Sequence, residues 1–517
     1  MSSDPLLVGI DLGTTGSRCM IFDTRGRCVA SAYREYPLNH IRAGWTEQSL
    51  PDMLDATADA CREAVSVVEP GAIAGVGLST QQCATCPTNA SGELLRPMIS
   101  WQDVRANAQA QALAEQITPE RYRTITGGPI TPQWVIGKIL WLRDNEPEIY
   151  ERAEKWPQVQ DLALRFLGAE GFSVDNTQAF FYGMWDVSNL TWSDEMLGLA
   201  GLDASHFGDV VPAGTQVGVV SSDAAARTGL PAGTPLCVGA GDQACGVVGM
   251  GATTPGIAAI TLGTAGMLTL GTQTPRTELE EFFTINHPVA GQWALQAPTL
   301  AAASSYRWFR DTFGQPERAA AERDGANAFE LLNELAAQAP PGSGGLIFMP
   351  FLNTAGAPHW NAEARGAFLG FLQSHERAHF ARAVMEGVAL ETYDNLNSLT
   401  GHGLTPERLR LGGGATHSTL WNHIQADTYG TPVELLEESE STALGAAILG
   451  GVGAGVFTDI ADGVNAAVRV RETIDPDLTN HQRYAETYAA YVDAYQSLAV
   501  STFGRITALQ SGEKGYD

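Results

Sequence analysis

A short loop near the start of the chain combines groups that could bind a phosphate. Gly13-Thr14-Thr15-Gly16 follows an apolar segment and offers backbone N–H groups and two hydroxyls, and Arg18 adds a cation. Glycine lets backbone donors approach a phosphate without obstruction by side chains. Asp11, just before the loop, could hold Mg²⁺ through water. The same residues could also form an ordinary hairpin in which Asp11 only caps a turn.

A second copy of this loop occurs in the other half of the chain. Gly263-Thr264-Ala265-Gly266 again follows a short apolar segment, and Leu-Gly-Thr occurs at both 12–14 and 262–264. Two such copies, each in a stretch the size of an ordinary domain, indicate a duplicated α/β fold. The repeat favours phosphate binding over a simple hairpin.

A carboxylate follows the predicted strand 236–240. Gly241-Asp242-Gln243 begins where that strand ends, and open α/β sheets bind ligands beyond the carboxyl ends of their strands. Asp242 is therefore placed as a general base. Because Asp and Gly are common turn residues, this turn taken alone is more often structural, and the assignment depends on the other features.

Phosphoryl transfer from ATP to an alcohol would use this set of groups. It requires a carboxylate that accepts the hydroxyl proton, a metal ion on the phosphates and donors for the developing charge. Asp242, Asp11 and the two loops could fill these roles. The sequence contains neither GxxxxGK[ST] nor GxGxxG, so the paired Gly/Thr hairpins are the remaining candidate for nucleotide binding.

Two further segments could bind the rest of the substrates. Gly412-Gly413-Gly414-Ala415 precedes a predicted helix and offers bare backbone to a purine or ribose, although a flexible turn explains it equally well. Gln81, Gln82 and Trp101 combine amides with an aromatic face, which suits a neutral polyhydroxy ligand. Trp101 could equally be a core aromatic, and Asp103 with Arg105 could be a surface ion pair.

Longer motifs resemble those of one enzyme family, the carbohydrate kinases named for a Phe-Gly-Gly-Tyr motif (the FGGY family). Lys138-Ile-Leu-Trp141-Leu-Arg-Asp144-Asn145 is similar to the core of its first signature. The second signature is similar to Gly366-Ala-Phe-Leu-Gly370-Phe371 with His379-Phe380 and Ala383-Val-Met-Glu386. Residues 44–48, 239–243, 412–415, 421–422, 426–427 and 442–446 are also similar, and the likeness weakens after about Val470.

The resemblance implies a fold, cofactors and a set of site residues. The fold would be two ribonuclease-H-like α/β domains of the actin and hexokinase type around a central cleft, and the cofactors ATP and Mg²⁺. Asp242 would be the catalytic carboxylate, and Asp11 the metal site. The nucleotide would contact Asp11, Gly13, Thr14, Thr15, Arg18, Gly263, Thr264, Gly413, Gly414, Ala415 and Asn422. The sugar would contact Gln81, Gln82, Trp101, Asp103, Gln133, Asp242 and Gln243.

The predicted sugar residues depart from two patterns of the family. Glycerol kinases carry an Arg-Glu pair where this chain has Gln82-Cys83, and xylulokinases usually carry Met-His there. Gln133 stands where glycerol kinases use a tyrosine. Gln82, Gln133 and Gln243 would form an amide-rich pocket that satisfies several hydroxyls without adding charge. We therefore expect a pentulose such as D-xylulose, with another ketose or an alditol as the alternative.

Two other activities are compatible with a nucleotide-binding fold of this kind. The chain could be an actin-like switch that binds ATP without phosphorylating a small molecule, which would have no need of Asp242 or the sugar-side residues. It could also be an ATPase whose sugar pocket has been lost. Release of ADP that a sugar stimulates distinguishes the kinase from both.

The elements that must position these residues can be predicted from apolar patterns and turns. Strands are predicted at 6–10, 19–22, 75–78, 236–240, 257–262, 267–270 and 345–349. Helices are predicted at 50–68, 134–145, 376–398, 418–429 and 482–504. At 517 residues the chain should form two domains, with the boundary near Gly246. We expect residues 1–246 to bind the sugar and carry the first phosphate loop, and 247–517 to bind the nucleotide.

The composition excludes several classes of partner. Lys and Arg number 31 against 58 Asp and Glu, a net charge of −27 that disfavours nucleic acid and anionic membranes. Backbone N–H groups, helix N-termini and a divalent cation can still attract a nucleotide locally. Uncharged stretches at 244–275 and 441–458 contain many glycines and are interpreted as buried strands and helices. The expected partner is a small neutral sugar or polyol, with a homodimer possible by family resemblance.

The cysteines and the N-terminus favour a cytoplasmic protein. Seven cysteines, an odd number mostly in apolar segments, suit a reducing compartment. Cys83 and Cys86 form a CxxC without a second Cys/His pair at zinc spacing, so no metal is assigned to them. The first residues lack the basic region of a signal peptide.

Overall fold

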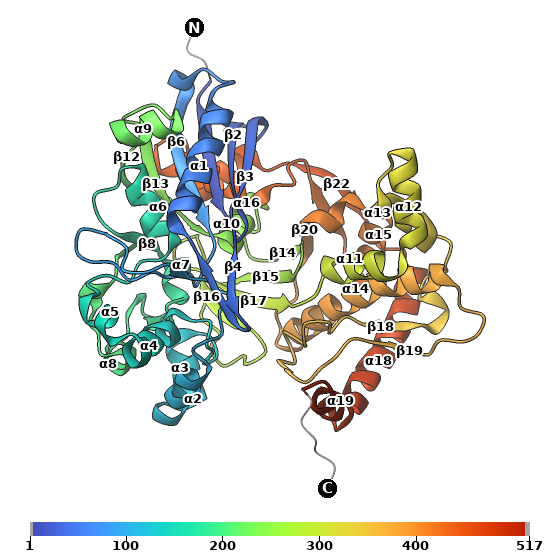
Figure 1. Cartoon of the computed structure of the whole chain (residues 1–517). Helices are drawn as coiled ribbons and strands as arrows, with labels where there is room; N and C mark the ends of the chain where they lie inside the picture. The colour runs from blue at the N-terminus through green and yellow to red at the C-terminus, as the bar shows by residue number, and fades with distance from the viewer. Residues whose placement is uncertain (1–3, 512–517) are drawn as a thin grey trace. The chain divides into compact units, whose positions relative to one another are not determined.

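The computed structural model describes residues 4–511 and contains two compact units (Figure 1). Of the described residues, 4–255, 271–295 and 440–469 belong to unit 1, and 256–270, 296–439 and 470–511 to unit 2. The chain crosses between the units five times: after Pro255, within β15 (Gly266–Thr272), within β17 (Trp293–Thr299), before Glu440 and after Arg469. The predicted division into residues 1–246 and 247–517 concerns which half binds which ligand, and it stays a prediction.

Unit 1 contains a mixed sheet with strand order β12-β13-β6-β1-β2-β3. Strands β1, β6 and β13 are parallel, and β1, β2 and β3 form an antiparallel meander. The strands of unit 1 are β1 (Leu6–Leu12), β2 (Gly16–Asp23), β3 (Cys28–Glu35), β4 (Asn39–Arg42), β5 (Trp45–Gln48), β6 (Ile73–Thr80), β7 (Met98–Ile99), β8 (Ser173–Asp175), β9 (Trp185–Asp186), β10 (Thr191–Trp192), β11 (Asp209–Val211), β12 (Gln216–Val219), β13 (Pro235–Gly241) and β16 (Phe283–Asn286).

Helices cover both faces of this sheet. Helices α1, α6 and α9 pack on one face, and α10 and α16 on the other. The helices of unit 1 are α1 (Leu50–Val65), α2 (Asn107–Gln116), α3 (Pro119–Thr126), α4 (Val135–Asn145), α5 (Pro147–Arg152), α6 (Val159–Leu167), α7 (Asn176–Phe180), α8 (Asp194–Ala200), α9 (Ser222–Thr228), α10 (Asp242–Gly249), α16 (Ser441–Gly453) and α17 (Ile460–Ala467).

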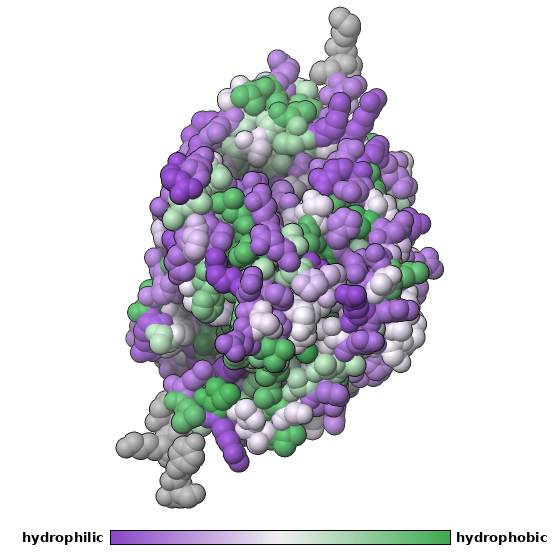
Figure 2. All heavy atoms as spheres, turned by 90° about the vertical axis from the view of Figure 1, so that its right-hand side faces the viewer, coloured by the Kyte–Doolittle hydropathy of each residue, from purple (hydrophilic) through white to green (hydrophobic). Residues whose placement is uncertain are grey.

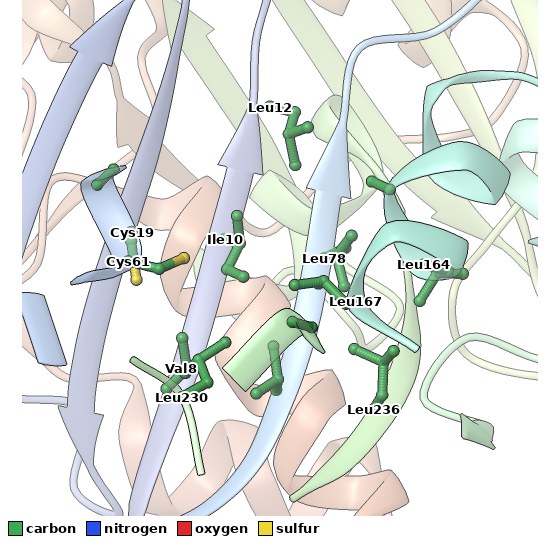
Figure 3. Close-up of a cluster of buried hydrophobic side chains, with 14 of the residues drawn as sticks. Val8, Ile10, Leu12, Cys19, Cys61, Leu78, Leu164, Leu167, Leu230 and Leu236 are labelled. Atoms are coloured by element: carbon green, nitrogen blue, oxygen red, sulfur yellow. The ribbon is translucent and has the colours of Figure 1, made fainter. Parts of the chain in front are cut away.

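The alternation of side chains along β1 divides the core of unit 1 into two layers. Val8, Ile10 and Leu12 point into the cluster beneath α1, α6 and α9, together with Leu78 of β6 (Figure 3). Leu7 belongs to the opposite cluster, which α10 and α16 cover. Since side chains alternate along a strand, Asp11 lies on the α10 and α16 side of β1.

Glycines allow α16 to approach the sheet closely. A Cβ atom at Gly9 would lie 2.0 Å from the carbonyl oxygen of Ala443, and one at Gly77 would lie 2.0 Å from that of Ala446. Neither contact leaves room for a larger residue. The predicted buried helix in the uncharged stretch 441–458 is thereby confirmed as α16.

The second mixed sheet has the strand order β16-β17-β15-β14-β20-β21-β22, and all of its strands except β16 belong wholly or in part to unit 2. The strands of unit 2 are β14 (Ile257–Leu262), β15, β17, β18 (Ile347–Met349), β19 (Ala367–Leu369), β20 (Arg408–Gly412), β21 (Val433–Leu436) and β22 (Val470–Ile474). Its helices are α11 (Ala303–Phe313), α12 (Gln315–Asp324), α13 (Ala328–Ala336), α14 (Arg377–Gly401), α15 (Thr419–Tyr429), α18 (Leu478–Ala499) and α19 (Thr502–Ser511). Helices α11, α13, α15 and α18 pack against one another or against α14.

The predicted duplication is confirmed by strand pairing. Strand β1 pairs antiparallel with β2 and parallel with β6, and β14 pairs antiparallel with β15 and parallel with β20. Each unit therefore carries one strand-loop-strand copy with a Gly-Thr loop.

Two predicted elements differ from the structure. The helix expected at 482–504 is divided into α18 and α19, with Val500 between them 85% exposed. The strand expected at 345–349 begins only at Ile347, because Gly344 and Gly345 have φ values of 64° and 87°, which a strand does not accommodate. The other predicted strands and helices are confirmed, with ends that shift by a few residues.

Hydrophilic side chains are spread over the face of the molecule in Figure 2, with hydrophobic groups between them. None of the helices between residues 4 and 511 has both the length and the apolar character that crossing a membrane requires.

Candidate active site

Asp11 lies at the carboxyl end of the sheet in unit 1. The pairing of β1 with β6 sets Asp11 beside Ser79, whose hydroxyl donates to a carboxylate oxygen of Asp11 at 2.7 Å. Burial raises the pKa of Asp11 to about 6, and the hydrogen bond from Ser79 opposes this shift. A half-buried carboxylate of this kind gains from a nearby cation.

Asp242 lies at the same edge of the sheet. Strand β13 ends at Gly241 beside Thr80 of β6, and Asp242 begins α10. Burial raises the pKa of Asp242 to about 7, and the negative charge of Asp11 contributes to the same shift. The backbone N–H of Gln243 donates to Asp242 at 2.7 Å and opposes it. Asp242 thus has the pKa expected of a general base that acts near neutral pH.

Gln82 packs directly on the backbone beside Asp242. A Cβ atom at Gly241 would lie 1.9 Å from Nε2 of Gln82. This Nε2 is buried, and among the described residues it has no hydrogen-bond partner. A buried amide donor without a partner is costly, so a ligand hydroxyl that accepts from Gln82 would relieve that cost.

A chain of hydrogen bonds joins the predicted sugar residues to the first phosphate loop. Gln81 donates to Gln48 at 3.0 Å, and Gln48 donates to the carbonyl of Thr14 at 2.8 Å. The indole N–H of Trp101 donates to the hydroxyl of Thr14 at 2.9 Å. Trp101 is 40% exposed, so the alternative of a core aromatic is wrong for this residue.

Asp103 and Arg105 form a buried ion pair. Their exposures are 1% and 8%, so the alternative of a surface pair is wrong. Arg105 donates to both carboxylate oxygens of Asp103 at 2.7 to 3.0 Å, and the backbone N–H of Thr46 donates to Asp103 at 2.6 Å. Both oxygens of Asp103 thus accept hydrogen bonds from within the protein. Direct contact of Asp103 with a sugar stays a prediction.

Three other predicted residues of unit 1, Gln133, Gly13 and Arg18, have partners within the protein. Gln133 precedes α4, is partly buried and accepts a hydrogen bond from the Thr131 hydroxyl. In the first loop, the N–H of Gly13 donates to Gly16 at 3.0 Å, so a phosphate would need the N–H groups that follow. Arg18 lies opposite Asp11 on β2 and pairs with Glu440 at 2.7 Å.

The predicted nucleotide residues of unit 2 come together at the ends of β14 and β20. These strands pair in parallel with Thr261 beside Gly412, and a Cβ atom at Gly413 would lie 2.7 Å from the carbonyl oxygen of Leu262. Gly413 also has a φ of 84°, which favours glycine. The loop with Gly263 and Thr264 therefore adjoins the Gly413 segment.

The backbone at Gly414 borders open space. A Cβ atom at Gly414 would meet no heavy atom within 4 Å, so the space beside it is open. Asn422 of α15 donates to the carbonyl of Thr416 at 2.9 Å, which links α15 to the turn that follows Ala415. The Oδ1 atom of Asn422 is buried and has no partner among the described residues. These features fit a nucleotide base or ribose.

Several residues that shape the site were not predicted. Ser79 holds Asp11, Glu440 pairs with Arg18, Gln48 fixes Thr14, and Thr177 accepts from the N–H of Gly241 at 3.0 Å. Ser79 could have been found from its position at the end of a strand, in the same register as Asp11. Glu440 gave no such signal because it is remote in sequence from Arg18.

Models of known families match most of the chain. The N-terminal domain of the FGGY family of carbohydrate kinases matches residues 6–249, and the C-terminal domain of that family matches residues 258–454. The N-terminal domain of the family thus matches the first half of the chain, and the C-terminal domain matches most of the second half.

Similar proteins phosphorylate different substrates according to their names. The chain is 29% identical to a xylulose kinase of Staphylococcus epidermidis, with 97% of this chain and 99% of the relative covered. It is 30% identical to an autoinducer-2 kinase of Escherichia coli (97% and 96%) and 28% identical to a gluconokinase of Bacillus subtilis (86% and 86%). The structure of a xylulose kinase from Rhodospirillum rubrum has a TM-score of 0.87 at 28% identity, covering 96% of this chain and 100% of that one. The predicted fold class of two actin-like ATPase domains is thereby confirmed.

Proposed function

The chain belongs to the FGGY family of carbohydrate kinases, and from that premise we propose that it phosphorylates a pentulose such as D-xylulose with ATP. The observation that carries the proposal is Asp242 at the carboxyl end of β13, with a pKa raised to about 7 and the buried amide of Gln82 beside it. Asp242 would accept the proton of the sugar hydroxyl that attacks the γ-phosphorus. Gln82 and Gln243 would hold neighbouring hydroxyls.

The residues of the two loops fit a nucleotide with Mg²⁺. When bound, Mg²⁺ neutralises charge on the phosphates. Asp11 would hold it through water, because its carboxylate is kept in place by Ser79 and is poorly compensated by other charges. Thr14, Thr15 and Thr264 would donate to the phosphates, and Gly413 and Gly414 would leave space for the adenosine.

The charges around the sugar residues support a neutral substrate over a sugar acid. Arg105 is paired with Asp103 at 2.7 Å and with Glu47 at 2.9 Å, and Arg18 is paired with Glu440. Lys138 is fully buried and donates to a backbone carbonyl. A carboxylate on the substrate needs a cation to replace its lost hydration, and these three already have partners.

The proposal is tested by release of ADP from Mg-ATP in the presence of xylulose, ribulose, other ketoses, alditols, glycerol and gluconate. Stimulation by a pentulose at micromolar to millimolar KM supports the proposal. Stimulation by gluconate alone would overturn the argument from charge. If no sugar stimulates ADP release while ATP still binds, the chain acts as an actin-like ATP switch or an ATPase.

The pH dependence of turnover follows from the raised pKa of Asp242. A carboxylate acts as a base only when ionised, so kcat/KM for the sugar should increase about tenfold from pH 6 to pH 8, with a midpoint near 7. The binding of ATP alone, measured over the same range, serves as the control and should not follow this midpoint. A profile that stays flat down to pH 5 would exclude Asp242 as the titrating base.

A further inference from the structure

Lys138 is a buried cation without an acidic partner. It belongs to α4, is 0% exposed, and forms no ion pair within the described residues. Its ammonium group donates to the carbonyl oxygen of Cys83. Burying an ammonium group is costly unless it makes strong hydrogen bonds. The hydrogen bond to Cys83 therefore offsets part of the cost of burying Lys138.

The carbonyl that Lys138 holds belongs to a strained peptide next to Gln82. Cys83 has a φ of 61°, in the left-handed region that a residue with a Cβ atom rarely adopts. Its N–H donates to the side chain of Gln158 at 2.9 Å, and Gln158 donates to the carbonyl of Gln178 at 2.8 Å. The peptide groups on both sides of Cys83 are therefore fixed from outside the loop.

The surroundings of Lys138 disfavour the charged form of its side chain. Burial lowers the pKa of Lys138 to about 8, the thiol of Cys83 and the carboxylate of Asp103 oppose that shift, and Arg105 adds to it. Asp103 is already paired with Arg105. The carbonyl of Cys83 is thus the group that stabilises the ammonium directly.

We propose that Lys138 is a positioning residue for the sugar. By holding the Cys83 carbonyl, it keeps the loop in the left-handed turn that aims the unpartnered amide of Gln82 at the ligand beside Gly241. This inference rests on the proposed function for the identity of the ligand. The geometry of the loop itself does not depend on it.

The first test is the change of Lys138 to methionine, which keeps length and apolar volume but removes the donor. KM for the sugar should increase at least about tenfold, since the amide of Gln82 loses its orientation, while KM for Mg-ATP stays within about twofold. Lys155→Met is the matched control, because Lys155 also donates to backbone carbonyls, those of Ser205 and Phe207, in a different loop. An unchanged KM for the sugar in K138M, or an equal rise for both substrates, would overturn the inference.

A second measurement separates this inference from the proposed function. Cys83 is 5% exposed in the native loop, so a thiol reagent followed by peptide mass analysis should leave it unmodified. In K138M the loop should open and Cys83 should react, whereas the buried thiols of Cys61 and Cys237 stay protected. If no sugar proves to be a substrate, protection of Cys83 in K138M still refutes the role of Lys138. Modification of all three thiols would mean that the variant has unfolded, and Lys138→Leu would then be compared in its place.

Discussion

Replacing Asp242 by asparagine is expected to lower kcat by about 10²- to 10⁴-fold, the contribution typical of a general base. Asparagine has nearly the same shape and still accepts the hydrogen bond from the N–H of Gln243, so α10 should begin in the same place. It cannot accept a proton from the sugar. Affinity for Mg-ATP should therefore change little, and KM for the sugar should change much less than kcat.

Asp209→Asn provides the control for this variant. Asp209 is exposed and belongs to β11 of the same unit, which pairs with β8 in a sheet separate from the one formed by β1, β6 and β13. Single-turnover measurements with saturating sugar and Mg-ATP isolate the chemical step from product release. Full turnover in D242N, with the control also active, would remove Asp242 from the mechanism.

The hairpins and the edge of the sheet could be predicted from sequence because they are local. Residues 6–10 and 257–262 are apolar runs that end in Gly-Thr loops, and such runs carry their strand signal within a few residues. Asp242 follows its strand directly, so its position at the carboxyl edge was predictable too. The prediction did not depend on knowing which strands are neighbours.

The partners of the site residues could not be predicted because they are distant in sequence. Whether Trp101 lies in the core or reaches Thr14, and whether Asp103 with Arg105 is buried, depends on how β4, β5 and β7 fold over the loop. Helix α16 is apolar on all sides, so its sequence does not say against which sheet it packs. It joins unit 1 through glycine contacts that no periodicity reveals.

The burial of Lys138 could not be predicted from the sequence. Its neighbours Ile139, Leu140 and Trp141 predict a helix with a buried face, but a lysine is normally expected on the exposed side. The structure places the ammonium beneath the Cys83 carbonyl because α4 is buried over most of its length. The role proposed for Lys138, as a positioning residue for the sugar, therefore rests on the three-dimensional packing and could not be predicted from the motif.

Replacing Asp11 by asparagine is expected to lower kcat about 10- to 100-fold at moderate Mg²⁺, since outer-sphere carboxylates typically contribute that much to metal-dependent activity. Raising the Mg²⁺ concentration should restore part of the loss. The variant should also shift the acid limb of the pH profile to lower pH. The negative charge of Asp11 is one of the causes that raise the pKa of Asp242, and asparagine removes that charge.

Ser79→Ala gives an intermediate case for Asp11. This variant keeps the carboxyl group but removes the hydroxyl that donates to it at 2.7 Å, so the pKa of Asp11 should rise further and the loss of activity should be smaller than in D11N. A smaller fraction of Asp11 is then ionised near neutral pH, so its charge raises the pKa of Asp242 less, and the acid limb should move to lower pH by less than in D11N. If D11N shows neither a stronger dependence on Mg²⁺ nor a shifted acid limb, Asp11 neither holds the metal nor acts on the base. The loop at residues 13–16 would then be a structural hairpin, and phosphate binding would have to be assigned to the residues of unit 2.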